Sequence, residues 1–256
     1  MTNRTSMSMS ITDRRVADHA PAIRASGLAV GYGHRPVVDG IDFALYPGQM
    51  LVLIGTNGSG KSTLLKTLAG LLDPQGGDVS VLGAAPGTQP ARVAYLPQHP
   101  VSSHTLPLRV ENVVMMGRFA RHGLLGRMGS EDFNVVEASM RRTGAIEFRH
   151  RPLRDLSGGQ QQRTHLAQVL SREGDVLLLD EPTAGLDVAG RRLVADLIAE
   201  ERRRGVSVVM ATHELSDADT ADAAILVAQR VVSQGPPHEV LTDAALREVF
   251  GFTQPH

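Results

Sequence analysis

The glycine-rich segment 55–63 has the residue types and the spacing needed to hold a phosphate group. It fits the pattern G-x-x-x-x-G-K-[ST], follows the apolar run Leu51–Ile54 and precedes a stretch with helical spacing. In that setting backbone N–H groups and the positive end of a helix converge on an anion. Lys61 is expected to reach the β- and γ-phosphates, and Ser62 to bind Mg²⁺. The segment therefore predicts an ATP-type nucleotide site formed by Gly55, Asn57, Gly58, Ser59, Gly60, Lys61, Ser62 and Thr63.

Two carboxylates follow a second apolar run, Val176–Leu179. If this run is a strand beside the phosphate loop, Asp180 lies near the metal ion and binds it through the water shell. Glu181 then points onward and can polarise the attacking water as a general base. A solvated acidic turn is the alternative for an isolated Asp-Glu pair. The catalytic interpretation therefore depends on the neighbouring phosphate loop.

A third motif, Ser157-Gly158-Gly159-Gln160, opens another segment with helical spacing. Ser157 is a suitable N-cap, and the exposed N–H groups of such a helix start form a second anion site. One nucleotide needs only one phosphate cradle, so a second cradle requires another purpose. A simple N-cap with glycines for a turn is the alternative interpretation.

The order of these motifs resembles the nucleotide-binding subunit of ATP-binding cassette (ABC) transporters, from about Ile23 to Phe250. The resemblance implies that the third motif completes the ATP site of a second copy of the chain in a head-to-tail dimer. It also implies four further site residues: Tyr32 stacking on adenine, Gln98 sensing Mg²⁺ and water, Asp187 in the loop that crosses the dimer interface, and His213 contacting the γ-phosphate.

Periodicity and the resemblance together predict an α/β P-loop fold: a mixed β core, an antiparallel β subdomain and an inserted helical subdomain at about 100–155. Residues 1–22 are expected to be a disordered leader, 23–250 the ATPase domain and 251–256 a tail. The patterns predict strands at 23–32, 37–45, 51–54, 79–83, 92–96, 176–179, 206–211, 223–228 and 230–233, and helices at 62–71, 110–117, 130–143, 159–171, 189–204 and 243–250.

Composition limits the remaining classes of function. The chain has 256 residues, 42% of them hydrophobic, a formal net charge of −1 and no Cys. Disulfides and thiolate metal sites are excluded, and the ten histidines show no close ligand spacing, so no structural metal beyond Mg²⁺ is expected. The near-neutral charge gives no indication of nucleic-acid binding. No apolar run approaches the roughly 20 residues of a membrane-spanning helix.

The resemblance also suggests a biological role. A cassette without a fused membrane domain is typical of importers, and the segment Leu106–Arg118 resembles the branch that carries zinc or manganese. The implied partners are an integral membrane permease, docked through the region Pro100–Arg118, and indirectly an extracytoplasmic binding protein, which places the chain at the cytoplasmic face of the membrane. A siderophore importer, another ABC transporter, a nucleic-acid-associated ABC ATPase and a small-molecule kinase remain alternatives.

Overall fold

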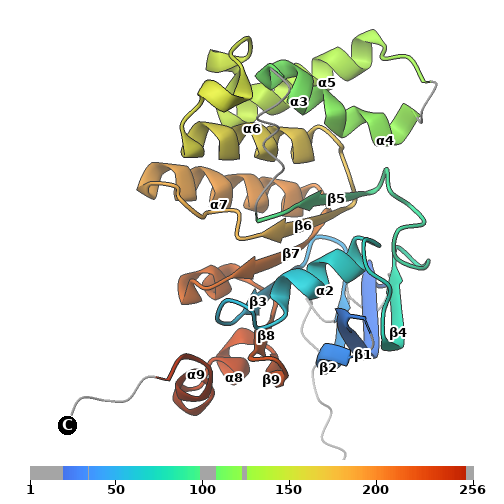
Figure 1. Cartoon of the computed structure of the whole chain (residues 1–256), viewed down its shortest axis with the longest axis vertical. Helices are drawn as coiled ribbons and strands as arrows, with labels where there is room; N and C mark the ends of the chain where they lie inside the picture. The colour runs from blue at the N-terminus through green and yellow to red at the C-terminus, as the bar shows by residue number, and fades with distance from the viewer. Residues whose placement is uncertain (1–19, 34, 99–107, 123–125, 252–256) are drawn as a thin grey trace, which may run out of the picture.

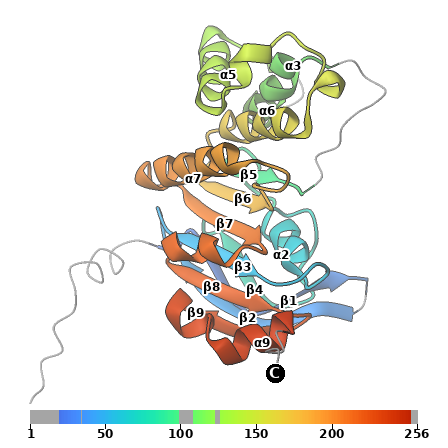
Figure 2. The same cartoon turned by 90° about the vertical axis from the view of Figure 1, so that its left-hand side faces the viewer.

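The computed structural model of the protein describes residues 20–33, 35–98, 108–122 and 126–251. A helical lobe lies at one end of the molecule and two sheets lie below it (Figures 1 and 2). The expectations for residues 1–19, 99–107 and 252–256 fall outside the described residues. Within the described ranges, every helix is too short or too polar to cross a bilayer.

The main sheet has six strands in the order β5-β6-β7-β3-β8-β9. All neighbouring pairs are parallel except β8 and β9, which form an antiparallel hairpin. Every residue of β3, β6 and β7 is buried, as expected for parallel strands covered on both faces. The strands are β3 (Met50–Ile54), β5 (Val93–Leu96), β6 (Val176–Asp180), β7 (Ser207–Thr212), β8 (Ala223–Val227) and β9 (Val231–Gly235).

A second, antiparallel sheet has the strand order β2-β1-β4. Its strands are β1 (Ile23–Tyr32), β2 (Arg35–Leu45) and β4 (Gly76–Val81). Its apolar residues share one core with helix α2 (Lys61–Leu68) and one face of the main sheet. The other face of the main sheet packs against four helices: α6 (Gly158–Leu170), α7 (Val188–Arg203), α8 (Pro237–Val240) and α9 (Asp243–Phe250).

The helical lobe has an apolar core of its own, which includes Val110, Val136, Met140 and Phe148. In both views α7 lies between this lobe and the main sheet (Figures 1 and 2). Besides α6, the lobe contains α3 (Val110–Met115), η1 (Met116–Arg118), α4 (Phe119–His122), α5 (Ser130–Thr143), η2 (Ala145–Phe148) and η3 (Leu153–Asp155).

The expected strands and long helices are all present, and two boundaries differ from the prediction by three residues. The helix predicted at 62–71 ends at Leu68, because Gly70 adopts a left-handed φ of +73° and packs against the backbone of Gly87. The strand predicted at 79–83 begins at Gly76, because it pairs with β1 as far as Ala29. The short helices α8 and η4 (Leu215–Thr220) were not predicted.

Candidate active site

The segment 55–63 forms a tight loop between β3 and α2. Gly55 lies so close to β8 that a Cβ atom there would be 2.1 Å from the carbonyl oxygen of Val227. Gly60 has a φ of +112°, and a Cβ atom there would be 2.3 Å from Val38. Only glycine fits either position, since the first lacks space and the second also requires a left-handed backbone. The loop is therefore held against β8 and β2.

Lys61 lies at the centre of this loop and is only 4% exposed. Its Nζ donates hydrogen bonds to the carbonyl oxygens of Gly55 at 2.7 Å and Thr56 at 3.0 Å. Burial lowers the pKa of Lys61, whereas the carboxylates of Glu181 and Asp180 favour its charged form. A buried cation beside two carboxylates suits a highly charged anion with its metal ion.

Asp180 is the last residue of β6 and is 2% exposed. Burial raises its pKa, and a hydrogen bond with the Ser62 side chain lowers it. Among the described residues, three buried side-chain atoms have no hydrogen-bond partner: Ser59 Oγ, Tyr95 Oη and Asp180 Oδ1. Such atoms normally have partners, so their concentration around one loop fits a site that binds a polar ligand.

Glu181 follows the strand with a left-handed φ of +49°, which is strained for a residue with a side chain. Its backbone N–H donates to the carbonyl oxygen of Ala211 at 2.9 Å, and its carboxylate lies 3.7 Å from His213 Nδ1. The next residue, Pro182, accepts a hydrogen bond from Gln162 Nε2 at 2.8 Å. This turn aims the Glu181 carboxylate at the phosphate loop and brings it close to His213.

A cavity of about 380 Å³ joins most of the predicted residues into one site. Tyr32 is 54% exposed at its edge, where its hydroxyl accepts a hydrogen bond from Lys66 at 3.2 Å. Asp180, Gly55 and His213 do not line this cavity. His213 lies next to it, because its Nδ1 is 3.7 Å from the carboxylate of Glu181. The lining residues are Tyr32, Val37, Asn57, Gly58, Ser59, Gly60, Lys61, Ser62, Thr63, Gln98 and Glu181.

Of the other predicted residues, Ser157, Gly159, Gln160 and Asp187 line a different cavity, of about 330 Å³. Ser157 is the N-cap of α6. Its Oγ accepts a hydrogen bond from the backbone N–H of Gln160, and Gln160 Oε1 accepts one from the backbone N–H of Ser157. Ser157, Gly159 and Gln160 face the loop Gly185–Asp187 across this cavity, and Gly158 is not among its lining residues. No residue lines both cavities. Within one chain, the predicted second anion site and the phosphate loop therefore line separate cavities.

Several site residues escaped the sequence reasoning. Val37 lines the first cavity, Arg163 lines the second, and Lys66 contacts Tyr32. Gln162 contacts a residue 20 positions away. Their helical or strand spacing was visible, but nothing in a pattern identifies a partner from another element.

The chain resembles known proteins over most of its length. The sequence profile described as ABC transporter matches residues 38–184. The manganese transport system ATP-binding protein MntB of Bacillus subtilis (strain 168) is 35% identical over 230 residues, 90% of this chain and 92% of that protein. The hemin import ATP-binding protein HmuV of Streptomyces coelicolor is 42% identical over 233 residues, 88% and 82% of the two chains. A solved inward-facing metal-chelate type ABC transporter superposes with a TM-score of 0.79 at 27% identity, covering 91% and 90%.

Proposed function

The chain belongs to the ABC transporter family and is one of its ATPases, and on this basis we propose that it drives the import of a metal ion such as manganese or zinc. The observation that carries the ATPase part is the single cavity that joins the phosphate loop, Gln98 and Glu181. The cargo part is supported by the similarity to MntB, a manganese transport protein, over 90% of the chain.

We assign the site residues these roles. Gly55 to Thr63 hold the ATP phosphates, with Lys61 as the buried cation, and Tyr32 stacks on the adenine. Ser62, Gln98 and Asp180 would hold Mg²⁺, and the unpartnered Asp180 Oδ1 and the hydroxyl of Ser62 are oxygen donors of the type this ion prefers. When bound, Mg²⁺ would neutralise charge on the β- and γ-phosphates.

The catalytic group in this proposal is Glu181. Its carboxylate takes the proton of the attacking water, and the strained turn keeps it directed at the loop. His213, 3.7 Å from Glu181, contacts the γ-phosphate and orients that carboxylate. Lys61 stabilises the negative charge of the phosphate oxygens.

Two copies of the chain are needed to complete each site. This part of the proposal is supported by the separation of the two cavities. Ser157 and Asp187 line one cavity, and the phosphate loop lines the other. In a head-to-tail dimer, the Ser157, Gly158, Gly159 and Gln160 of one copy would cover the ATP held by the other. A monomer alone would be catalytically incomplete.

The remaining partners follow from the family. We propose that a membrane permease holds the helical lobe, that an extracytoplasmic binding protein acts through that permease, and that nucleic acid has no role. The chain would then lie at the cytoplasmic face of the membrane, with residues 23–250 as the ATPase domain, 1–22 as a leader and 251–256 as a tail.

Import of a metal chelate is the second candidate, because the hemin import relative has the higher identity, 42%. A strain that lacks the chain would separate the two. Restored uptake of manganese or zinc by the wild-type chain, but not by Lys61→Ala, would support the proposal. Restored uptake of hemin or a ferric siderophore alone would favour the chelate, and no cargo restored would refute an import role.

The ATPase mechanism has a separate test. Glu181→Gln keeps the shape of the side chain and removes the base, so turnover should fall about 10²–10⁴-fold while ATP still binds. Sedimentation of this variant in the presence of ATP should then show a stable dimer. Near-normal turnover of this variant with its permease would reject Glu181 as the base.

A further inference from the structure

The segment that carries His213 is fixed at its first residue by a carboxylate outside the phosphate site. Thr212 Oγ1 donates a hydrogen bond to Asp217 Oδ2 at 2.6 Å. The same hydroxyl accepts a hydrogen bond from the backbone N–H of Glu214 at 3.0 Å, so Thr212 is connected to Glu214 across His213. Asp217 is a half-buried residue of η4. The backbone on both sides of His213 is therefore tied to one side chain, which Asp217 holds.

The residue after the histidine is held from a different element. Arg191, in the first turn of α7, pairs with Glu214: Nη1 lies 3.0 Å from Oε1. The same guanidinium donates through Nε to the carbonyl oxygen of Leu186 at 3.4 Å. Leu186 belongs to the loop that carries Asp187, so Arg191 connects the loop of the second cavity to the histidine segment.

Arg191 also competes with His213 for the Glu214 carboxylate. Glu214 Oε1 lies 3.9 Å from His213 Nε2 and 3.0 Å from Arg191 Nη1. Because the arginine is the nearer donor, the carboxylate is drawn away from the histidine ring. Without Arg191, the Glu214 carboxylate would be free to pair with His213 and turn the ring away from Glu181.

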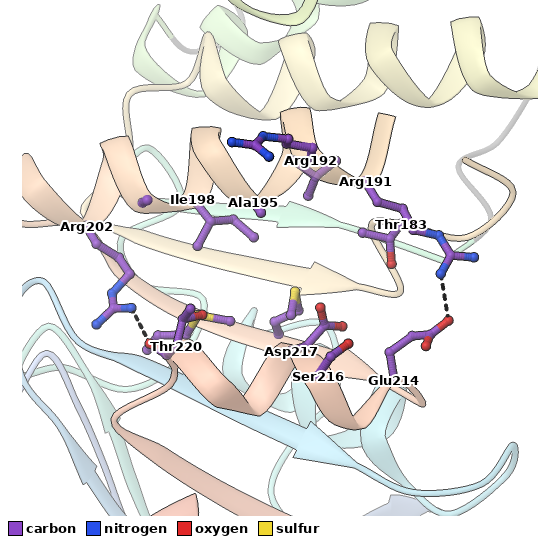
Figure 3. Close-up of a pocket in the computed structure, with 14 residues that line it drawn as sticks. Thr183, Arg191, Arg192, Ala195, Ile198, Arg202, Glu214, Ser216, Asp217 and Thr220 are labelled. Atoms are coloured by element: carbon purple, nitrogen blue, oxygen red, sulfur yellow. Dashed lines mark hydrogen bonds and ion pairs between the residues drawn. The ribbon is translucent and has the colours of Figure 1, made fainter. Parts of the chain in front are cut away.

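A cavity of about 320 Å³ lies behind this segment, between α7 and η4 (Figure 3). Glu214, Ser216 and Asp217 point into it from one side, and Arg191 and Ile198 face them from α7 (Figure 3). Leu215 and Ala218 of η4 pack into the core, but Glu214 and Asp217 border the cavity and do not pack closely against α7 here. The hydrogen bonds of Asp217 and Arg191 therefore carry more of the positioning than they would in a filled core.

We propose that Asp217 and Arg191 are positioning residues for His213: Asp217 fixes the residue before the histidine, and Arg191 fixes the residue after it. Neither touches the phosphate cavity, so both act through His213. The inference rests on the proposed role of His213 at the γ-phosphate.

If Asp217 and Arg191 served only to stabilise the fold, their substitution would not change contact with the γ-phosphate. Arg191 and Glu214 are 52% and 37% exposed at their side chains, and ion pairs this exposed contribute little to stability. Burial raises the pKa of Asp217, so its charge is not a source of folding stability at neutral pH. Arg191→Gln and Asp217→Asn should therefore leave the melting midpoint almost unchanged, whereas Asp217→Ala should lower it, because the buried Thr212 hydroxyl loses its acceptor.

The test compares ATP with ADP, since only ATP carries the γ-phosphate. In the full-length Glu181→Gln chain, calorimetry would give the ratio of ATP to ADP affinity. Asp217→Ala and Arg191→Gln should each lower that ratio about tenfold, because a small misplacement of one contact is costly. Asp217→Asn keeps an acceptor oxygen for Thr212 and should restore most of the ratio. The matched controls Asp219→Ala, an exposed residue of η4, and Arg192→Gln, an exposed residue of α7, should leave it unchanged.

A His213→Ala background decides the mechanism. There, Asp217→Ala and Arg191→Gln should change the ratio of ATP to ADP affinity less than twofold, because the histidine that they position is absent. An undiminished further loss in that background, or an unchanged ratio in the single variants, would overturn the proposal. If His213→Ala by itself leaves the ratio unchanged, the assigned role of His213 fails, and with it the basis of this inference.

Discussion

The Arg118→Met substitution should destabilise the helical lobe by breaking a buried ion pair. Arg118 is 4% exposed. It donates to Asp132 Oδ1 at 2.9 Å, to the carbonyl oxygen of Ser171 at 2.8 Å and to Glu173 at 2.8 Å. It thereby connects η1 to α5 and to the turn that leads into β6.

The magnitude follows from what the substitution leaves behind. Removing one partner of a buried ion pair costs about 3–5 kcal/mol, because the other charge stays buried. Asp132 keeps a hydrogen bond from the Gly129 N–H at 2.8 Å and a contact with His122 Nε2 at 2.8 Å, so we expect the lower end, about 3 kcal/mol. For a chain of this size, that loss lowers the melting midpoint by about 6–12 °C.

The pH dependence gives a second observable. Hydrogen bonds from His122, Gly129 N–H and Arg118 hold the pKa of Asp132 far below its usual range. A folded-state pKa below the unfolded value means that the ionised carboxylate contributes stability at neutral pH and that this contribution declines as pH falls. The deficit of Arg118→Met should therefore persist down to about pH 4, the ordinary range of a carboxyl group, and shrink only as the pH falls further.

Urea denaturation followed by circular dichroism, at pH 7 and below about pH 4, measures both quantities. The matched control is Arg141→Gln on α5, because the Arg141 side chain is 67% exposed and its ion pair with Glu137 lies at the surface. This control should leave the unfolding midpoint nearly unchanged. A deficit below about 1 kcal/mol for Arg118→Met, or a deficit that does not depend on pH, would refute the reasoning that a buried charge is left without its partner.

Three further substitutions test other parts of the structure. Gly55→Ala should abolish measurable ATP binding in calorimetry, because its Cβ would lie 2.1 Å from Val227 O, and binding within threefold of wild type would contradict this. Tyr32→Ala should weaken ATP binding by about 1–3 kcal/mol and Tyr32→Phe much less, and equal effects would argue against stacking. Leu178→Ala, at a fully buried position of β6, should cost about 2–5 kcal/mol in urea unfolding, and a cost below 1 would show that the site collapses around the smaller side chain.

The sequence predicted the fold well where periodic or motif signals are strong. The buried strands β3 and β6 and the helix Asp243–Phe250 were predicted within one residue of the structure, because unbroken apolar runs and helical spacing are local signals. Boundaries failed at Gly70 and at Gly76–Gly77, where the deciding contact is with a distant strand or turn. Glycine carries no side-chain pattern, so such positions are decided by pairing.

The site shows the same division. The phosphate loop and the pair Asp180 and Glu181 were predicted from local patterns, because each follows an apolar strand whose end places its residue types together. The left-handed backbone of Glu181 was not predictable, since it depends on a hydrogen bond to Ala211 in β7.

The sequence by itself determined which chemistry is possible, because residue types and their spacing within one segment set the ligands, the charges and the local backbone. Only the tertiary structure decided which of these groups meet. It joined segments from β1 to β6 around one cavity, separated the Ser157 segment from it, and tied Thr212 to Asp217 and Glu214 to Arg191 on the two sides of His213. The reason is physical: contacts between residues far apart in sequence depend on how whole elements pack, and no local pattern encodes that packing.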